Sequence, residues 1–285
     1  MTDHRVTPKL GRRPAGCAAA RPPIVTTPAS QSSSGAQRHG SSTSHDEEVW
    51  QRIETVVGRA GHSLTDVLES FPVYARRVNI TRFLAHYELY RKVSHLPGNL
   101  VDCGVYRGVS LFEWAKFLEI FHGGDRTRRV FGFDNFAGFT SLNEKDGPDY
   151  AHANKVQGGW DAGPFYEELK EHVEIFHQDS FVPRAKRIVL VEGDLTETAR
   201  DFVADNPGFR ISLLHLDVDL YEPTLAALEA FYPCVVSGGL VVFDEYGQTE
   251  WAGESKAAEE YFGADFPAIE KFPFSSLPGA FFRKP

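Results

Sequence analysis

The sequence predicts an α/β fold whose sheet is doubly wound and mostly parallel. Short apolar segments alternate with amphipathic, helix-like segments from about residue 98 onward, and acidic residues directly follow several of the apolar segments. Alternation of strand and helix gives parallel strands joined by right-handed crossovers. Ligands bind such sheets beyond the carboxyl ends of the strands, which is where the acidic residues fall.

The region before the sheet has two parts. Residues 1–45 are rich in Ser, Pro, Gly, Ala and Arg without a periodic apolar pattern, so we expect a disordered tail. In residues 46–97 apolar side chains recur every three or four positions, which predicts additional N-terminal helices with a break at Pro72. These helices would cover the sheet or a neighbouring subunit, and we expect a homo-oligomer.

Residues 98–285 form the predicted α/β domain. Its strands are expected at residues 99–103, 129–133, 187–191, 211–216 and 239–243. Its helices are expected at residues 110–121, 165–176, 197–205, 223–232 and 253–262. A polar, Gly-rich stretch, residues 140–160, separates the second strand from its helix and is long enough to form a lid over a site at the strand ends.

The composition argues against several functional classes. The chain has 285 residues, 42% of them hydrophobic and 24% charged, as in ordinary globular proteins. Residues 1–45 hold six of the 30 Lys and Arg residues but one of the 39 acids, so the remainder carries a formal charge of −14, which disfavours nucleic acid as a partner. Three widely spaced cysteines form no disulfide framework, and no apolar run approaches the roughly 18 residues of a membrane span. We therefore expect a cytoplasmic protein without membrane contact.

Two acidic clusters close the fourth and fifth predicted strands. Asp217 and Asp219 follow residues 211–216, and Asp244 and Glu245 follow residues 239–243. Four carboxylates that lie close together repel one another and raise each other's pKa unless a cation sits among them. A site made only of oxygen atoms suits a hard divalent cation, Mg²⁺ before Mn²⁺ or Ca²⁺, and argues against Zn²⁺. The alternative is a set of solvated acids that cap two strand ends.

The first and second predicted strands carry the features of a nucleoside site. Gly104 and Gly108 flank the turn from the first strand into a helix, where backbone groups can approach a ligand. Their spacing is not that of dinucleotide-binding proteins, which disfavours NAD. Asp134 closes the second strand, where an acid can accept hydrogen bonds from both ribose hydroxyls. S-adenosylmethionine, an adenosine-containing ligand without a pyrophosphate, fits this combination.

Six segments in this order resemble the macrocin O-methyltransferase family: VDCGVYRG, GFDNFAGF, VEGDLTET, LLHLDVDLYEPT, SGGLVVFDEYG and GESKAAEEYF. The resemblance covers roughly residues 83–262. It implies the Rossmann-like fold of class I S-adenosylmethionine-dependent methyltransferases and a metal-dependent methylation of sugar hydroxyls in antibiotic pathways. Within the family the chain looks most like members that act on nucleotide-linked 6-deoxyhexoses, such as the TDP-rhamnose 3-O-methyltransferases of enediyne pathways.

The resemblance also implies roles for individual residues. Asp217, Asp244 and Glu245 match the metal ligands, although several relatives have Asp at the position of Glu245, and Asp219 matches the general base. Asp217 is also expected at the cofactor. The other expected cofactor-binding residues are Asp102, Gly104, Tyr106, Gly108, Ser110, Asp134, Asn135, Phe136, Gly193 and Asp194.

Two histidines are open to competing interpretations. His215 alternates with Leu214 and Leu216 on a predicted central strand, so we expect a buried structural histidine first and a catalytic base second, after Asp219. His86 lies on a predicted helix and is expected to be a surface or interface residue.

Three alternative functions remain open at this stage. The sugar could already be attached to an aglycone when it is methylated. The spacing of Asp217 and Asp219 is also that of metal-dependent glycosyltransferases, which bind a nucleotide sugar through a cation, but this interpretation leaves Asp134 and the Gly104 turn without a role. A non-catalytic binding protein is the third alternative.

Overall fold

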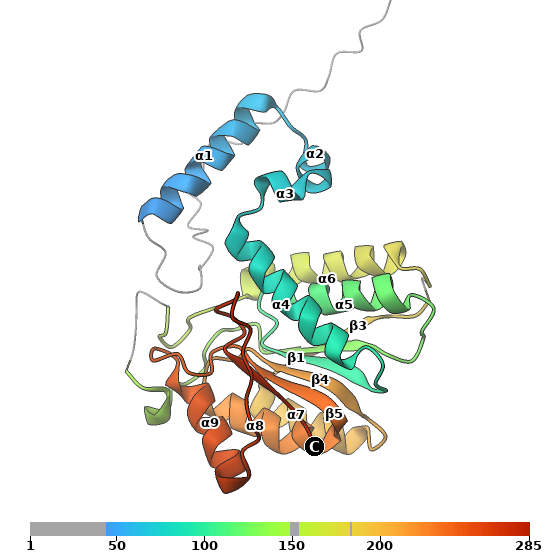
Figure 1. Cartoon of the computed structure of the whole chain (residues 1–285), viewed down its shortest axis with the longest axis vertical. Helices are drawn as coiled ribbons and strands as arrows, with labels where there is room; N and C mark the ends of the chain where they lie inside the picture. Colours follow the sequence, from blue (N-terminus) through green and yellow to red (C-terminus); the bar gives the residue numbers. More distant parts are fainter. Residues whose placement is uncertain (1–43, 149–153, 183) are drawn as a thin grey trace, which may run out of the picture. The chain divides into compact units, whose positions relative to one another are not determined.

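The computed structural model describes residues 44–148, 154–182 and 184–285 (Figure 1). The chain divides into two units, residues 1–36 and 37–285, and every described residue belongs to the second unit. The expected disordered tail therefore lies outside the described residues, apart from its last two positions. Among the described residues, no helix combines the length and the apolar character that a membrane span requires.

Four helices precede the sheet: α1 (Ser44–Ala60), α2 (Leu64–Glu69), α3 (Phe71–Tyr74) and α4 (Arg77–Val93). The expected break at Pro72 is wrong in detail. Pro72 lies in the first turn of α3, where a backbone N–H would have no acceptor within the helix, so its absence is harmless. The breaks lie instead between α2 and α3 and between α3 and α4. α4 packs against α5, β4 and β5, and it buries Leu89, Tyr90 and Val93.

The sheet has six strands in the order β3-β2-β1-β4-β5-β6. The strands are β1 (Asn99–Cys103), β2 (Val130–Asp134), β3 (Ile188–Glu192), β4 (Ile211–Leu216), β5 (Val235–Phe243) and β6 (Ala280–Arg283). The first five are parallel and β6 is antiparallel to β5. The predicted fold class is therefore confirmed, with β6 as an addition that the sequence did not indicate, because its four residues carry no usable periodicity.

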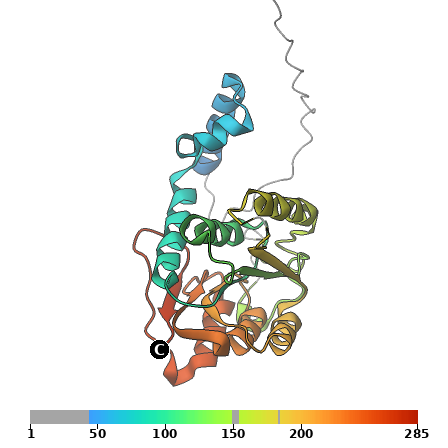
Figure 2. The same ribbon diagram turned by 90° about the vertical axis from the view of Figure 1, so that its right-hand side faces the viewer.

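Helices cover both faces of this sheet (Figures 1 and 2). The helices within and after the sheet segment are α5 (Val109–His122), α6 (Gly163–Asp179), α7 (Leu195–Asp205), α8 (Tyr221–Phe231) and α9 (Ala252–Phe262), with 3-10 turns η1 (Glu144–Asp146), η3 (Tyr232–Cys234) and η4 (Gly263–Asp265). One core contains side chains of α4, α5 and α6, and a second contains side chains of α7, α8 and α9. Strand residues alternate between these two cores, as in a sheet that is buried on both faces.

The described residues of the expected lid, which was predicted at residues 140–160, form hydrogen bonds with the start of α8 and with the segment before α9. The backbone N–H of Tyr221 donates to Asp146 Oδ1 at 2.6 Å, and Asn143 Nδ2 donates to Glu222 Oε1 at 2.8 Å. Lys155 is buried, and its ammonium group donates to the backbone carbonyls of Asp146 and Glu250. This segment therefore lies at the carboxyl edge of the sheet. Residues 149–153 lie outside the described residues.

Gly104 is required by the approach of β1 to the segment that follows β4. Its φ is +90°, and a Cβ atom at this position would stand 1.7 Å from the backbone oxygen of Asp217. The expectation that Gly104 makes room for a ligand is therefore incomplete, since its missing side chain makes room for the protein's own backbone.

We predict that Gly104→Ala lowers the free energy of unfolding by about 2–4 kcal/mol, from left-handed strain and overpacking together. Chemical denaturation measures this value. Gly124→Ala is the matched control, because Gly124 lies in an exposed turn and a methyl group added there would have no neighbouring atom within 4 Å. Equal stability of the two variants would contradict the assignment.

Candidate active site

The two acidic clusters meet at the carboxyl ends of β4 and β5. One carboxylate oxygen from each of Asp217, Asp244 and Glu245 lies within 4.8 Å of the others. Asp244 and Glu245 are buried, and Asp217 and Asp219 are half-buried. The structure thus brings together the three residues that the sequence indicated as metal ligands.

Asp219 adopts a left-handed backbone conformation beside these carboxylates. Its φ is +62°. For any residue other than glycine, this conformation is unfavourable in free energy. Burial raises the pKa of Asp219 well above its ordinary value, and Asp217 and Asp244 raise it further. The ionised form of Asp219 is therefore destabilised by its acidic neighbours unless a cation offsets them.

Glu254 is a fifth acid in this site, and the sequence analysis missed it. It lies in the first turn of α9 and is fully buried, and its Oε2 accepts a hydrogen bond from the backbone N–H of Glu245 at 2.6 Å. The buried atoms Glu245 Oε2 and Glu254 Oε1 have no hydrogen-bond partner among the described residues. The sequence pattern that could have indicated Glu254 is an acid between Gly253 and the Ala257-Ala258 pair, which lie on the buried side of α9.

Arg82 of α4 is the second residue that the sequence analysis missed. Its Nη2 lies 2.7 Å from Asp217 Oδ2, and its Nη1 lies 3.0 Å from Asp244 Oδ2. Burial lowers the pKa of Arg82, but Asp244, Asp217 and other acids outweigh this effect and hold it above its ordinary value. Arg82 is thus a permanent cation within the acidic site.

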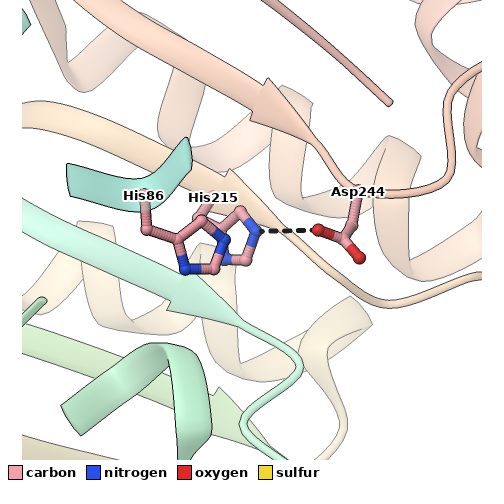
Figure 3. A group of neighbouring side chains, drawn as sticks. All are labelled: His86, His215 and Asp244. Atoms are coloured by element: carbon pink, nitrogen blue, oxygen red, sulfur yellow. Dashed lines mark ion pairs between the residues drawn. The ribbon is translucent and has the colours of Figure 1, made fainter. Parts of the chain in front are cut away.

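His215 connects this site to the centre of the sheet (Figure 3). Its Nδ1 lies 2.6 Å from Asp102 Oδ1, and its Nε2 lies 3.5 Å from Asp244 Oδ1. Burial lowers the pKa of His215, but the contacts with Asp102 and Asp244 raise it to about 10. Each nitrogen of the imidazole therefore faces a carboxylate, Nδ1 that of Asp102 and Nε2 that of Asp244.

The prediction that His86 is a surface or interface residue is wrong. Its side chain is fully buried, its Nδ1 lies 2.5 Å from Glu113 Oε2, and its ring centroid is 5.2 Å from that of His215. One nitrogen of His86, one nitrogen of His215 and one oxygen of Asp244 lie within 4.8 Å of one another, the spacing of a possible metal site (Figure 3). His215 Nε2 and Asp244 Oδ1 face each other at 3.5 Å, so we interpret this trio as an ion-pair arrangement.

Asp102 and Ser110, two of the expected cofactor-binding residues, point into this buried network. Asp102 is fully buried and accepts hydrogen bonds from Ser110 Oγ at 2.8 Å and from Trp114 Nε1 at 3.3 Å. Together with the contact to His215, these bonds use both of its oxygens. In this conformation neither side chain is available to a ligand.

Asp134 organises the ends of β1 and β2. Its Oδ2 accepts a hydrogen bond from the backbone N–H of Tyr106 at 2.7 Å, and its Oδ1 accepts one from Phe136 at 2.7 Å. Both partners are left-handed, with φ of +47° at Tyr106 and +53° at Phe136. Asn135 completes this turn, because its side chain accepts from the N–H of Ala137 and donates to the carbonyl of Gly138.

The remaining expected cofactor-binding residues lie at turns of the same sheet edge. Gly108 caps α5 with φ of +88°, and a Cβ atom there would meet Leu169 at 2.6 Å. The backbone N–H of Gly193 donates to the carbonyl of Asp134 at 3.0 Å. Asp194 caps α7 through a bond from the N–H of Thr196 at 2.9 Å. Their backbone roles are thus defined without a ligand.

Known proteins match this chain both in sequence and in structure. The family model for macrocin O-methyltransferase (TylF) matches residues 88–265. The chain is 30% identical over 156 residues to the 8-demethyl-8-(2,3-dimethoxy-alpha-L-rhamnosyl)-tetracenomycin-C 4'-O-methyltransferase of Streptomyces olivaceus, covering 53% of this chain and 54% of that protein. It is 25% identical over 158 residues to the mycinamicin III 3''-O-methyltransferase of Micromonospora griseorubida, covering 53% and 56%. The chain thus spans about half the length of these curated relatives.

Solved structures match over a longer part of the chain. The calicheamicin methyltransferase CalS11 superposes with a TM-score of 0.79 at 31% identity, covering 86% of this chain and 94% of that chain. The apo structure of CalS11, described as a TDP-rhamnose 3'-O-methyltransferase, superposes with a TM-score of 0.71 at 31% identity, covering 86% and 96%. From the family match and this similarity we conclude that the chain belongs to the macrocin O-methyltransferase family.

Proposed function

We propose that this protein transfers the methyl group of S-adenosylmethionine, with the help of a divalent cation, to a hydroxyl of a deoxysugar in antibiotic biosynthesis. The observation that carries the proposal is the convergence of Asp217, Asp244 and Glu245 at the carboxyl edge of β4 and β5, in the same sheet edge as Asp134 of β2. The family membership supports methyl transfer over the glycosyltransferase and binding-protein alternatives.

The side chains present fit a hard divalent cation such as Mg²⁺. The donor set consists of carboxylate oxygens only, and the buried atom Glu245 Oε2 has no hydrogen-bond partner among the described residues. Asp217, Asp244 and Glu245 would hold the cation. When bound, it would supply positive charge that stabilises the developing negative charge on a sugar hydroxyl.

Asp219 is the proposed general base. It lies in the acidic cluster but outside the trio of proposed ligands. It would take the proton of the sugar hydroxyl as the hydroxyl oxygen attacks the methyl group. The bond between the methyl carbon and sulfur breaks, and its electron pair stays on the sulfur of S-adenosylhomocysteine. His215, whose two nitrogens face Asp102 and Asp244, is proposed to hold Asp244 in place instead of acting as a base.

The ends of β1, β2 and β3 are the proposed cofactor site. Asp134 is half-buried, and its two oxygens, each with one backbone hydrogen bond, retain lone pairs for the ribose hydroxyls. Gly104, Tyr106 and Gly108 would lie beside the methionyl part, and Asp194 would approach the adenine. Asp217 would border both the cofactor and the cation. For Asp102 and Ser110 we now propose a positioning role through His215.

We propose a nucleotide-linked 6-deoxyhexose as the sugar substrate. The support is the similarity to the CalS11 structure described as a TDP-rhamnose methyltransferase, which extends over 86% of this chain. A homo-oligomer and a cytoplasmic location also stay predictions. The exposed apolar side chains Leu64, Leu68, Phe71 and Val73 of the N-terminal helices are compatible with a partner subunit.

We expect the purified protein to methylate TDP-rhamnose or a related TDP-deoxysugar with labelled S-adenosylmethionine, and EDTA to abolish this transfer until Mg²⁺ is added back. The physical reason is that Arg82 offsets only part of the charge of the buried carboxylates, so they cannot all stay ionised around a sugar without a divalent cation. The same sugar attached to an aglycone is the comparison substrate. Transfer only to the aglycone form would refute the nucleotide-linked substrate, and full activity in EDTA would refute the metal requirement.

Asp219→Asn should leave Mg²⁺ and cofactor binding within a few-fold of the original, since Asn keeps the shape of the side chain. Turnover should fall on the order of 10²–10⁴-fold, with kcat and kcat/KM reduced together. Steady-state kinetics and calorimetry measure the two effects, and Glu229→Gln on the exposed face of α8 is the control. Loss of Mg²⁺ binding in Asp219→Asn would identify Asp219 as a ligand.

Asp134→Asn should weaken S-adenosylmethionine binding by about 1.5–3 kcal/mol, because a charged acceptor is lost from two ribose hydroxyls. Isothermal titration calorimetry measures the dissociation constant, with Asp205→Asn at the exposed end of α7 as the control. An unchanged dissociation constant would limit Asp134 to its backbone contacts.

A further inference from the structure

Arg82 occupies the place where two of the proposed metal ligands converge. Its two terminal nitrogens contact different carboxylates, Nη2 with Asp217 Oδ2 at 2.7 Å and Nη1 with Asp244 Oδ2 at 3.0 Å. The guanidinium therefore ties together the acids that follow β4 and β5. Arg82 lies before residue 88, where the family match begins.

A divalent cation and this guanidinium would compete for the same two carboxylates, those of Asp217 and Asp244. Mg²⁺ binds carboxylate oxygen at about 2.1 Å, so a Mg²⁺ ion on Asp217 Oδ2 would lie within roughly 5 Å of a guanidinium nitrogen that stays 2.7 Å from that oxygen. Two cations at this separation repel each other strongly in a buried site. The other oxygen of Asp244 is also engaged, because it faces His215 Nε2 at 3.5 Å.

We propose that Arg82 is the internal counter-cation of the metal-free site and that it must leave Asp217 and Asp244 when the divalent cation binds. This inference rests on the metal site of the proposed function. Arg82 has two consequences in this scheme: it stabilises the metal-free protein, and it lowers the affinity for the metal. The free energy by which Arg82 stabilises the metal-free site equals the free energy by which it weakens metal binding, because coupling between two binding events is reciprocal.

The surroundings of Arg82 provide an acceptor for the displaced guanidinium. Glu113 of α5 is among the acids that raise the pKa of Arg82, yet it is not one of the proposed ligands. The side chain of Glu113 is 13% exposed, and one of its oxygens contacts His86, one turn along α4 from Arg82. In this scheme the displaced guanidinium turns toward Glu113.

The test compares Mg²⁺ affinity and thermal stability in four proteins freed of metal by EDTA and dialysis: the unmodified chain and three variants. Arg82→Gln removes the charge, Arg82→Lys keeps the charge but cannot bridge two carboxylates, and Arg76→Gln is the control just before the start of the same helix, where Arg76 pairs with Asp46. We expect Arg82→Gln to bind Mg²⁺ more tightly than the unmodified chain, on the order of 10-fold, and Arg82→Lys to fall between them.

The melting temperatures give an independent measure. Metal-free Arg82→Gln should melt below the unmodified chain, and Mg²⁺ should raise its melting temperature by more. Arg76→Gln should match the unmodified chain in Mg²⁺ affinity. If Arg82→Gln does not fold without metal, Arg82→Lys decides the sign of the effect on affinity.

The possible failures are distinguishable. If the unmodified chain does not bind Mg²⁺ at millimolar concentration, the metal site of the proposed function is wrong, and the inference falls with it. If the unmodified chain binds Mg²⁺ and both Arg82 variants bind it equally well or more weakly, the metal site stands. Arg82 would then support the ligands instead of competing with the cation.

Discussion

Electrostatic repulsion among acids at the carboxyl edge of β4 and β5 is the constraint on which the rest of the site depends. The acids concerned are Asp217, Asp219, Asp244, Glu245 and Glu254. Burial and mutual repulsion raise the pKa of Asp217 to about 7 and those of Asp219, Glu245 and Glu254 well above their ordinary values. Such a group can stay ionised only when cations offset it. Arg82 and His215 offset part of the charge.

This electrostatic balance makes the N-terminal helix α4 part of the site. His215 spans from Asp102 on β1 to Asp244 after β5, and Arg82 continues from Asp244 to Asp217 after β4. The contacts therefore cross three adjacent strands and end on a helix that precedes them in the chain. A shift of α4 would change the position of Arg82 and with it the charge that the acids experience.

The turns at the carboxyl ends of β1, β2 and β4 depend on a different constraint, which is backbone strain. Tyr106, Phe136 and Asp219 are left-handed at the carboxyl ends of β1, β2 and β4, each at a cost of about 1–3 kcal/mol. Asp134 offsets the free-energy cost at two of these positions, because its carboxylate accepts hydrogen bonds from the backbone N–H groups of Tyr106 and Phe136. The turns are thus held in one conformation before any ligand binds.

The sequence by itself determined the parallel strands β1 to β5, the helices between them and the meeting of four acids, Asp217, Asp219, Asp244 and Glu245, at one edge of the sheet. Periodicity defines strands and helices locally, and parallel strands bring their carboxyl ends to one edge, so residues at those ends meet. The tertiary structure decided what lies opposite that edge. Arg82 reaches Asp217 across 135 residues, and His86 is buried against His215 rather than exposed. Neither contact leaves a local pattern, because both depend on how α4 packs across β4 and β5.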